Sequence, residues 1–132
     1  MNNKYKANRI TNIAYSSLII IAALLVIIRW VSVFDSQFLV FNQEVNSHIN
    51  NFSLSLLFYL CVGFSWVLQG VSFKKIILLG ILIVLGNILC ESVMGFMNTT
   101  DPIDAIYGIC VTTITFCFLL ITNKYGLQII DK

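Results

Sequence analysis

The sequence predicts an all-α fold in which four transmembrane helices form an antiparallel bundle, and three observations support this prediction. Hydrophobic residues make up 58% of the 132 residues and charged residues only 11%, whereas soluble domains are about 45–50% apolar and about 25% charged. The mean hydropathy is +0.90. Four apolar stretches approach the ~20 residues that a helix needs to cross a bilayer. They lie at about residues 13–34, 52–70, 76–96 and 103–122.

The rest of the composition indicates a single integral membrane domain, residues 1–132, for which no cofactor is expected. One proline and seven glycines leave no flexible linker between the stretches. A net charge of +2 gives no electrostatic support for binding nucleic acid. The four cysteines form no CxxC motif and are interpreted as small hydrophobic residues within the apolar segments. They are Cys61, Cys90, Cys110 and Cys117.

The first stretch follows a basic segment, as the hydrophobic region of a signal peptide does. It is too long for a typical signal peptide, and no small-residue cleavage site follows in "VSVFDSQ". We therefore expect it to be retained as a membrane anchor. An outer loop at residues 35–51, "DSQFLVFNQEVNSHINN", follows it. The apolar residues 38–41 within this loop are expected to dip into the membrane interface.

The charged residues outside the apolar stretches predict the orientation of the bundle. The basic residues all fall on one side of a four-span hairpin bundle: Lys4, Lys6, Arg9, Lys74, Lys75, Lys124 and Lys132. The opposite side holds the acids and the histidine: Asp35, Glu44, His48, Asp101 and Asp104. By the positive-inside rule, both termini are expected in the cytoplasm. The short connections after the second and third stretches favour antiparallel neighbours.

The third stretch contains a carboxylate, Glu91, about one turn or more from its outer end. A carboxyl group at that depth is costly unless it faces the bundle interior, finds a partner or stays protonated. Arg29 is the only basic residue within the four stretches and lies at a similar depth. We therefore expect an Arg29–Glu91 ion pair, bidentate if the geometry allows. Such a pair is either a clamp between the first and third helices or part of a functional site.

The fourth stretch opens with "TTDPID", which has the pattern of a helix start. Asp101 suits the N-cap, Pro102 the first helical position and Asp104 the third, where a carboxylate complements the helix dipole. Capping alone could explain both acids, but it does not explain Glu91.

His48 precedes the second stretch and has two interpretations. It is either a solvated loop residue among asparagines, or it joins Glu91 and Asp104 in a site for acid–base chemistry or a metal. The sequence has no HExxH motif and no second histidine, so no metal is expected. The candidate polar cluster thus comprises Arg29, His48, Glu91, Asp101 and Asp104.

The order of three segments resembles the VanZ-like family of small multi-pass bacterial membrane proteins. A histidine opens the second span in "VNSHINNFSLSLLFYLCVG", a glutamate comes late in the third in "NILCESVMGF", and an aspartate opens the fourth in "DPIDAIYGICV". The residues that match the family pattern are His48, Glu91, Asp104 and Gly108.

The resemblance covers about residues 45–118 and departs from the family pattern at three places. Met94 stands where the family usually has Gln, a Thr–Thr pair at residues 99–100 where Arg is expected, and Tyr107 roughly where Asn is usual. The family is named after a member linked to low-level teicoplanin resistance. The resemblance implies a bacterial cytoplasmic membrane protein acting at the cell envelope, with an outward-facing pocket for a lipid head group, a cell-wall intermediate or an antibiotic.

Three alternatives remain open from the sequence. One is a small oligomeric channel or transporter-like protein that uses Glu91 as an ion or proton site. Another is a non-catalytic subunit of a defence, immunity or larger membrane complex, in which partner proteins contact the lipid-facing helices. An enzyme is the least favoured, because no nucleophile motif, phosphate loop or dinucleotide fingerprint occurs. The expected partners are membrane lipids, a lipid-linked or antibiotic ligand, and a second copy or another membrane protein.

Overall fold

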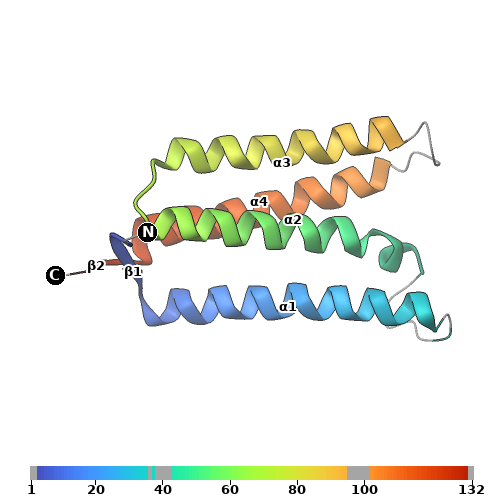
Figure 1. Ribbon diagram of the computed structural model, residues 1–132, viewed down its shortest axis with the longest axis horizontal. Coiled ribbons are helices and arrows are strands. Elements are labelled where there is room, and N and C mark those ends of the chain that lie inside the picture. Colours follow the sequence, from blue (N-terminus) through green and yellow to red (C-terminus); the bar gives the residue numbers. More distant parts are fainter. Residues whose placement is uncertain (1–2, 36, 38–42, 95–101, 131–132) are drawn as a thin grey trace.

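The computed structural model describes residues 3–35, 37, 43–94 and 102–130. Four long helices dominate it, and two three-residue strands lie near the chain ends (Figure 1). The elements in order are β1 (Tyr5–Ala7), α1 (Arg9–Phe34), α2 (Gln43–Leu68), α3 (Phe73–Met94), α4 (Pro102–Tyr125) and β2 (Leu127–Ile129).

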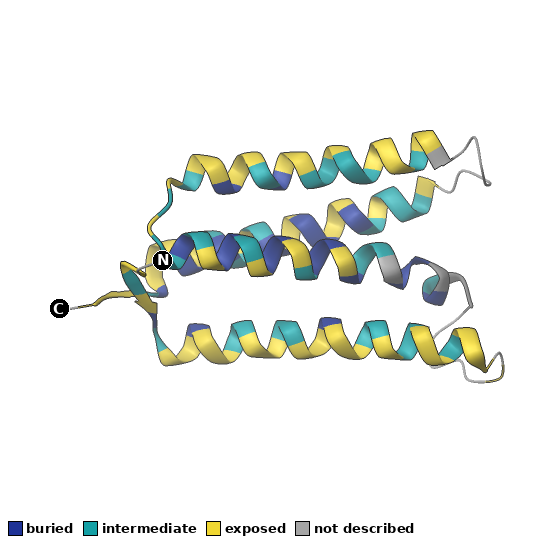
Figure 2. Cartoon of the chain, in the orientation of Figure 1, coloured by how far each residue is buried: buried dark blue, intermediate teal, exposed yellow. Residues whose placement is uncertain are grey.

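The helices α2 and α4 form the centre of the bundle, with α1 on one side and α3 on the other (Figure 1). The most apolar segment of α2 is 44% buried and that of α4 is 33% buried. The corresponding segments of α1 and α3 are only 6% and 11% buried. Figure 2 shows the resulting exposed surface along α1 and α3. Both strands and the α2–α3 turn lie at one end of the bundle (Figure 1). We call this the proximal end and the other the distal end.

Each described helix contains a segment long and apolar enough to cross a membrane, which supports a multi-pass membrane protein. Each of the four predicted stretches therefore overlaps one helix, but the second helix differs at its start. It begins at Gln43 rather than at residue 52, so most of the predicted outer loop is helical. Hydropathy alone missed these turns because their side chains are polar. The interfacial segment expected at residues 38–41 lies outside the described residues.

Two clusters of buried side chains hold the bundle together. The proximal cluster includes Tyr59, Phe64 and Leu119, and Tyr15 of α1 stacks on Phe64 with ring centroids 4.0 Å apart. The second cluster joins α1, α2 and α4 through Ala22, Leu56, Leu60 and Val111. The small side chain of Ala22 is completely buried, which allows α1 to approach α2 closely.

The strands β1 and β2 form an antiparallel ribbon that the sequence did not predict. Its register pairs Tyr5 with Ile129, Lys6 with Gln128 and Ala7 with Leu127. Asn8 extends this link, because its side chain caps α1 by accepting from Thr11 N at 2.8 Å. Its backbone N–H donates to the carbonyl of Gly126, also at 2.8 Å. The all-α prediction thus holds for the membrane-crossing helices, and a short ribbon joins the start of α1 to the end of α4.

The close approach of α2 and α3 leads to a stability prediction. A Cβ added at Gly80 would lie 2.6 Å from Tyr59 Oη and 2.9 Å from its Cζ. Tyr59 is fully buried and donates to the carbonyl of Ile76 at 3.0 Å, so its ring has little freedom to move. We expect Gly80→Ala to lower the free energy of unfolding by about 1–3 kcal/mol through overpacking.

The matched control is Gly86→Ala on the same helix, where an added Cβ meets nothing within 4 Å. We expect this change to be neutral or slightly stabilising, because alanine favours helix more than glycine does. Thermal unfolding of both variants in detergent provides the comparison. Equal unfolding temperatures for the two variants would contradict the close contact between α2 and α3.

Candidate functional site

Polar side chains gather at the distal end, where the first turns of α2 face α4. Asn46, His48, Ser53 and Ser55 of α2 are all buried. The sequence placed the first two in a loop, but the early start of α2 puts them on a helix. Helical geometry then fixes which of them face the bundle interior.

His48 contacts Asp104, the acid in the first turn of α4, through its Nδ1 and the carboxylate Oδ1. The His48 side chain is 3% exposed and that of Asp104 is 24% exposed. An ionised carboxylate only accepts hydrogen bonds, so the imidazole donates from Nδ1 when it meets Asp104 in that form. The interpretation of His48 as a solvated loop residue is therefore wrong. The contact joins α2 to α4 and holds the imidazole in one orientation.

Two aromatic residues pack around the histidine. The ring of Tyr107 stacks on His48 with centroids 5.2 Å apart and an interplanar angle of 23°. Phe52 meets Tyr107 edge to face at 6.5 Å. Tyr107 follows Asp104 by three residues and therefore shares its helix face. That spacing was visible in the sequence, although Tyr107 was treated there only as a departure from a family pattern.

Asn87 of α3 makes a second polar connection among the central helices. Its Nδ2 donates to Ser55 Oγ of α2 at 3.1 Å and to the carbonyl of Ile83 at 2.9 Å. Its amide group also occupies the space where a side chain on Gly108 of α4 would lie. Asn87 was not among the residues predicted from the sequence, although an uncharged amide within so apolar a stretch was the available signal.

Arg29 lies on α1, and its neighbourhood connects α1 to the start of α2. Ser32 Oγ donates to the carbonyl of Arg29 at 2.7 Å and accepts from Asn46 Nδ2 at 2.8 Å. The Nε atom of Arg29 is buried and has no hydrogen-bond partner within the described part of the chain.

The ion pair expected between Arg29 and Glu91 does not occur among the described residues. The physical reason is the arrangement of the helices, because α1 and α3 lie on opposite sides of the α2–α4 pair (Figure 1). Glu91 lies instead against α4. It lines a hollow of about 340 Å³ together with Pro102 and Ala105, two residues of the first turn of α4 that lie on either side of Asp104 in the sequence.

The start of α4 agrees with its predicted capping pattern as far as the structure describes it. Pro102 is the first residue of the helix and Asp104 lies in its first turn. Asp101, the expected N-cap, lies outside the described residues. Since Asp104 also contacts His48, capping does not account for its whole role.

The described residues contain no group of three or more His, Cys, Asp or Glu side chains that could hold a metal ion. What the site provides is an oriented imidazole, a partly exposed carboxylate and a phenol ring at the distal end. These groups can bind a polar ligand through hydrogen bonds and charge. Comparison with known protein families, characterised proteins and solved structures finds no match for this chain.

The contact between His48 and Asp104 predicts a measurable loss of stability. Asp104→Ala leaves the buried Nδ1 of His48 without this partner, which costs about 1–3 kcal/mol in soluble proteins. Hydrogen bonds between membrane helices contribute less, about 0.6–2 kcal/mol, and we expect a loss in this lower range. Asp104→Asn keeps an acceptor oxygen and should lose less. Thermal unfolding in detergent measures both variants.

The control is Asp35→Ala, which removes a carboxylate from the exposed distal end of α1. We expect a change of at most about 0.5 kcal/mol for this surface substitution. A similar effect for Asp35→Ala and Asp104→Ala would show that the contact with His48 adds no stability.

Proposed function

We propose that the protein is a VanZ-like component of the bacterial cell envelope that binds a polar ligand beside the His48–Asp104 pair. The partly buried contact between these two side chains carries the proposal. The family resemblance selected both residues, which are 56 positions apart in the sequence. Their contact in the fold is what a shared site requires.

The surroundings of the pair favour a ligand that combines charges and amide groups. The Asp104 carboxylate is partly exposed, and Glu91 lines a hollow with Pro102 and Ala105 from the same first turn of α4. His48 and Tyr107 supply ring nitrogen and phenol groups. A lipid head group, a cell-wall intermediate or a glycopeptide antibiotic offers matching ammonium and amide groups. Binding rather than catalysis is proposed, because the site includes no recognised nucleophile next to a base.

The distal end faces outward in this proposal, with both termini in the cytoplasm and the four helices antiparallel across the bacterial cytoplasmic membrane. The charge distribution supports this orientation through the positive-inside rule. Basic residues of the described chain gather around the proximal end: Lys4, Lys6, Arg9, Lys74, Lys75 and Lys124.

A second candidate is a non-catalytic subunit of a larger membrane complex, and Arg29 favours it. Charged groups within a membrane usually pair with another group, yet Nε of Arg29 is buried without an acceptor among the described residues. The exposed Trp30 and Phe34 on the same part of α1 would then contact a partner helix.

Reporter fusions test the orientation. An enzyme active only in the periplasm is fused after residue 130 or inserted within the α2–α3 turn, and separately inserted at Gln37 in the distal connection. We expect activity only for the Gln37 insertion, because Gln37 follows the distal end of α1 and the other two positions lie at the proximal end. Activity at the two proximal positions would reverse the proposed orientation.

A susceptibility assay tests the function. Cells expressing the wild type, Asp104→Asn or Glu91→Gln are compared for glycopeptide susceptibility and for envelope-stress response, with membrane abundance measured by blotting. We expect Asp104→Asn and Glu91→Gln to accumulate normally and to lose the wild-type phenotype. The control Asp35→Asn removes a distal carboxylate away from the site and should keep it.

The same assay separates the second candidate from the first. Loss of the phenotype in Arg29→Met alone, with Asp104→Asn unaffected, would favour the subunit hypothesis and contradict a ligand site at His48–Asp104. A protein that confers no envelope phenotype even as wild type would also overturn the first proposal.

A further inference from the structure

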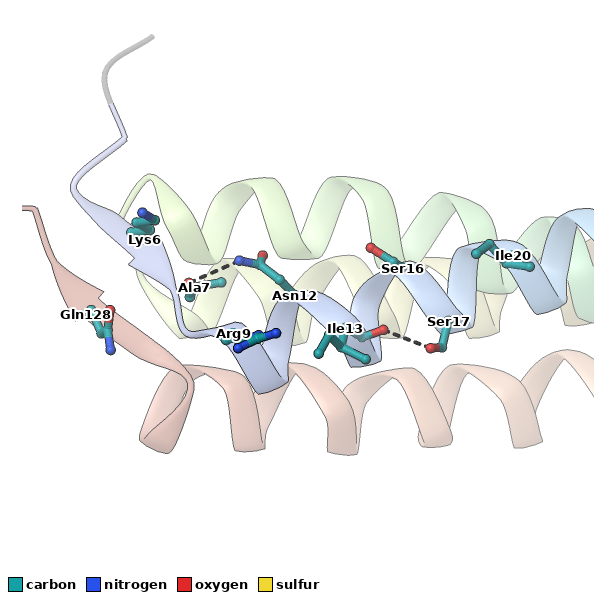
Figure 3. A pocket seen from close by; sticks show the side chains of 9 residues that line it. All are labelled: Lys6, Ala7, Arg9, Asn12, Ile13, Ser16, Ser17, Ile20 and Gln128. Carbon is teal, nitrogen blue, oxygen red and sulfur yellow. Dashed lines mark hydrogen bonds between the residues drawn. The ribbon is translucent and has the colours of Figure 1, made fainter.

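A hollow of about 650 Å³ lies at the proximal end, on the outer side of α1 and against the ribbon (Figure 3). It is at the opposite end of the bundle from His48 and Asp104. The side chains that line the hollow differ between its two ends. Cationic and amide side chains line the part beside the ribbon, and isoleucines and serines line the part along α1.

The ribbon end of the hollow carries two exposed cations. Lys6 comes from β1, where it pairs in register with Gln128 of β2, and Arg9 is the first residue of α1. Neither cation forms an ion pair with a carboxylate among the described residues. Two positive charges that share one hollow repel each other, and a bound anion would relieve that repulsion.

The rest of the hollow follows one face of α1. Ile13 and Ile20 lie four and eleven residues after Arg9, which is helical spacing for a single face, and each is 58% exposed. Ser17 between them donates its hydroxyl hydrogen to the carbonyl of Ile13 at 2.8 Å. Its polarity is thereby satisfied within the helix, so this face can adjoin an acyl chain.

The dimensions of the face match one leaflet of a bilayer. At 1.5 Å per residue, Ile20 lies about 16 Å along the helix from Arg9. One leaflet supplies about half of the ~30 Å hydrocarbon core. The cations therefore lie at the level of lipid phosphates when the isoleucines lie at the level of acyl chains.

We propose that this hollow binds one anionic phospholipid of the membrane leaflet at the proximal end. The lipid phosphate lies between Lys6 and Arg9, with the Gln128 amide as a further hydrogen-bond donor. One acyl chain follows Ile13 and Ile20. The lipid then bridges the ribbon and α1. A free phosphate could use the cations but not the apolar face, which is why a lipid is the occupant that fits the whole hollow.

Native mass spectrometry of the full chain in detergent tests the proposal. The protein is titrated with phosphatidylglycerol or with phosphatidylcholine of the same acyl chains, and separately with phosphatidylglycerol in the presence of inorganic phosphate. We expect a single tightly held phosphatidylglycerol, weaker phosphatidylcholine binding and no displacement by millimolar phosphate. The Lys6→Gln/Arg9→Gln double variant should bind phosphatidylglycerol about tenfold to thirtyfold more weakly.

Two further variants make the test specific to the hollow. Lys74→Gln/Lys75→Gln removes two exposed cations from the same end of the bundle and should change binding by no more than about twofold, since these residues do not line the hollow. Lys6→Arg/Arg9→Lys keeps both charges and should keep the binding. Equal losses in the two glutamine variants, equal binding of the two lipids, or displacement by phosphate would each overturn the proposal.

Discussion

The packing of α2 against α4 is the interaction on which the rest of the structure depends. It is continuous from the His48–Asp104 contact at the distal end, through Leu60 and Val111, to Gly63 against Leu119 nearer the proximal end. Lipid chains are as apolar as leucine, so burial from water does not drive helices together within a membrane. Close contact at small residues and hydrogen bonds between helices provide the attraction instead. Small-residue contacts and a hydrogen bond between helices both occur where α2 packs against α4, and α1 and α3 pack on the two sides of this helix pair.

The candidate site is a consequence of the same packing between α2 and α4. A histidine and a carboxylate can be buried in an apolar bundle only when each satisfies the other or has further partners. His48 and Asp104 meet where the first turns of α2 and α4 face each other, and Tyr107 and Phe52 close the space around the ring. About two turns further along α2 from His48, Asn87 connects α3 to α2 through Ser55. The polar groups thus lie between helices, while the lipid-facing surfaces of α1 and α3 stay apolar.

Much of the fold, but only part of the site, could be predicted from the sequence. Hydropathy identified the four membrane-crossing segments because soluble proteins rarely contain apolar runs of such length. It could not reveal that α2 continues through Asn46 and His48, because polar helical turns and polar loops have the same composition. The prediction of an Arg29–Glu91 ion pair was wrong because a similar depth in the membrane does not show which helices are neighbours in the bundle. The ribbon escaped prediction because three-residue strands depend on a partner more than a hundred residues away.

The ribbon between the chain ends also bears on how the protein is made. Asn8 donates through its side chain to the carbonyl of Tyr125, 117 residues later in the chain, and β1 has no partner until β2 exists. At about 5–20 residues per second, a ribosome needs roughly 6–23 s to extend the chain that far. The contacts of α1 with α2 can form earlier, because α2 follows α1 directly in the chain. The ribbon can therefore begin to form only after β2 has been synthesised.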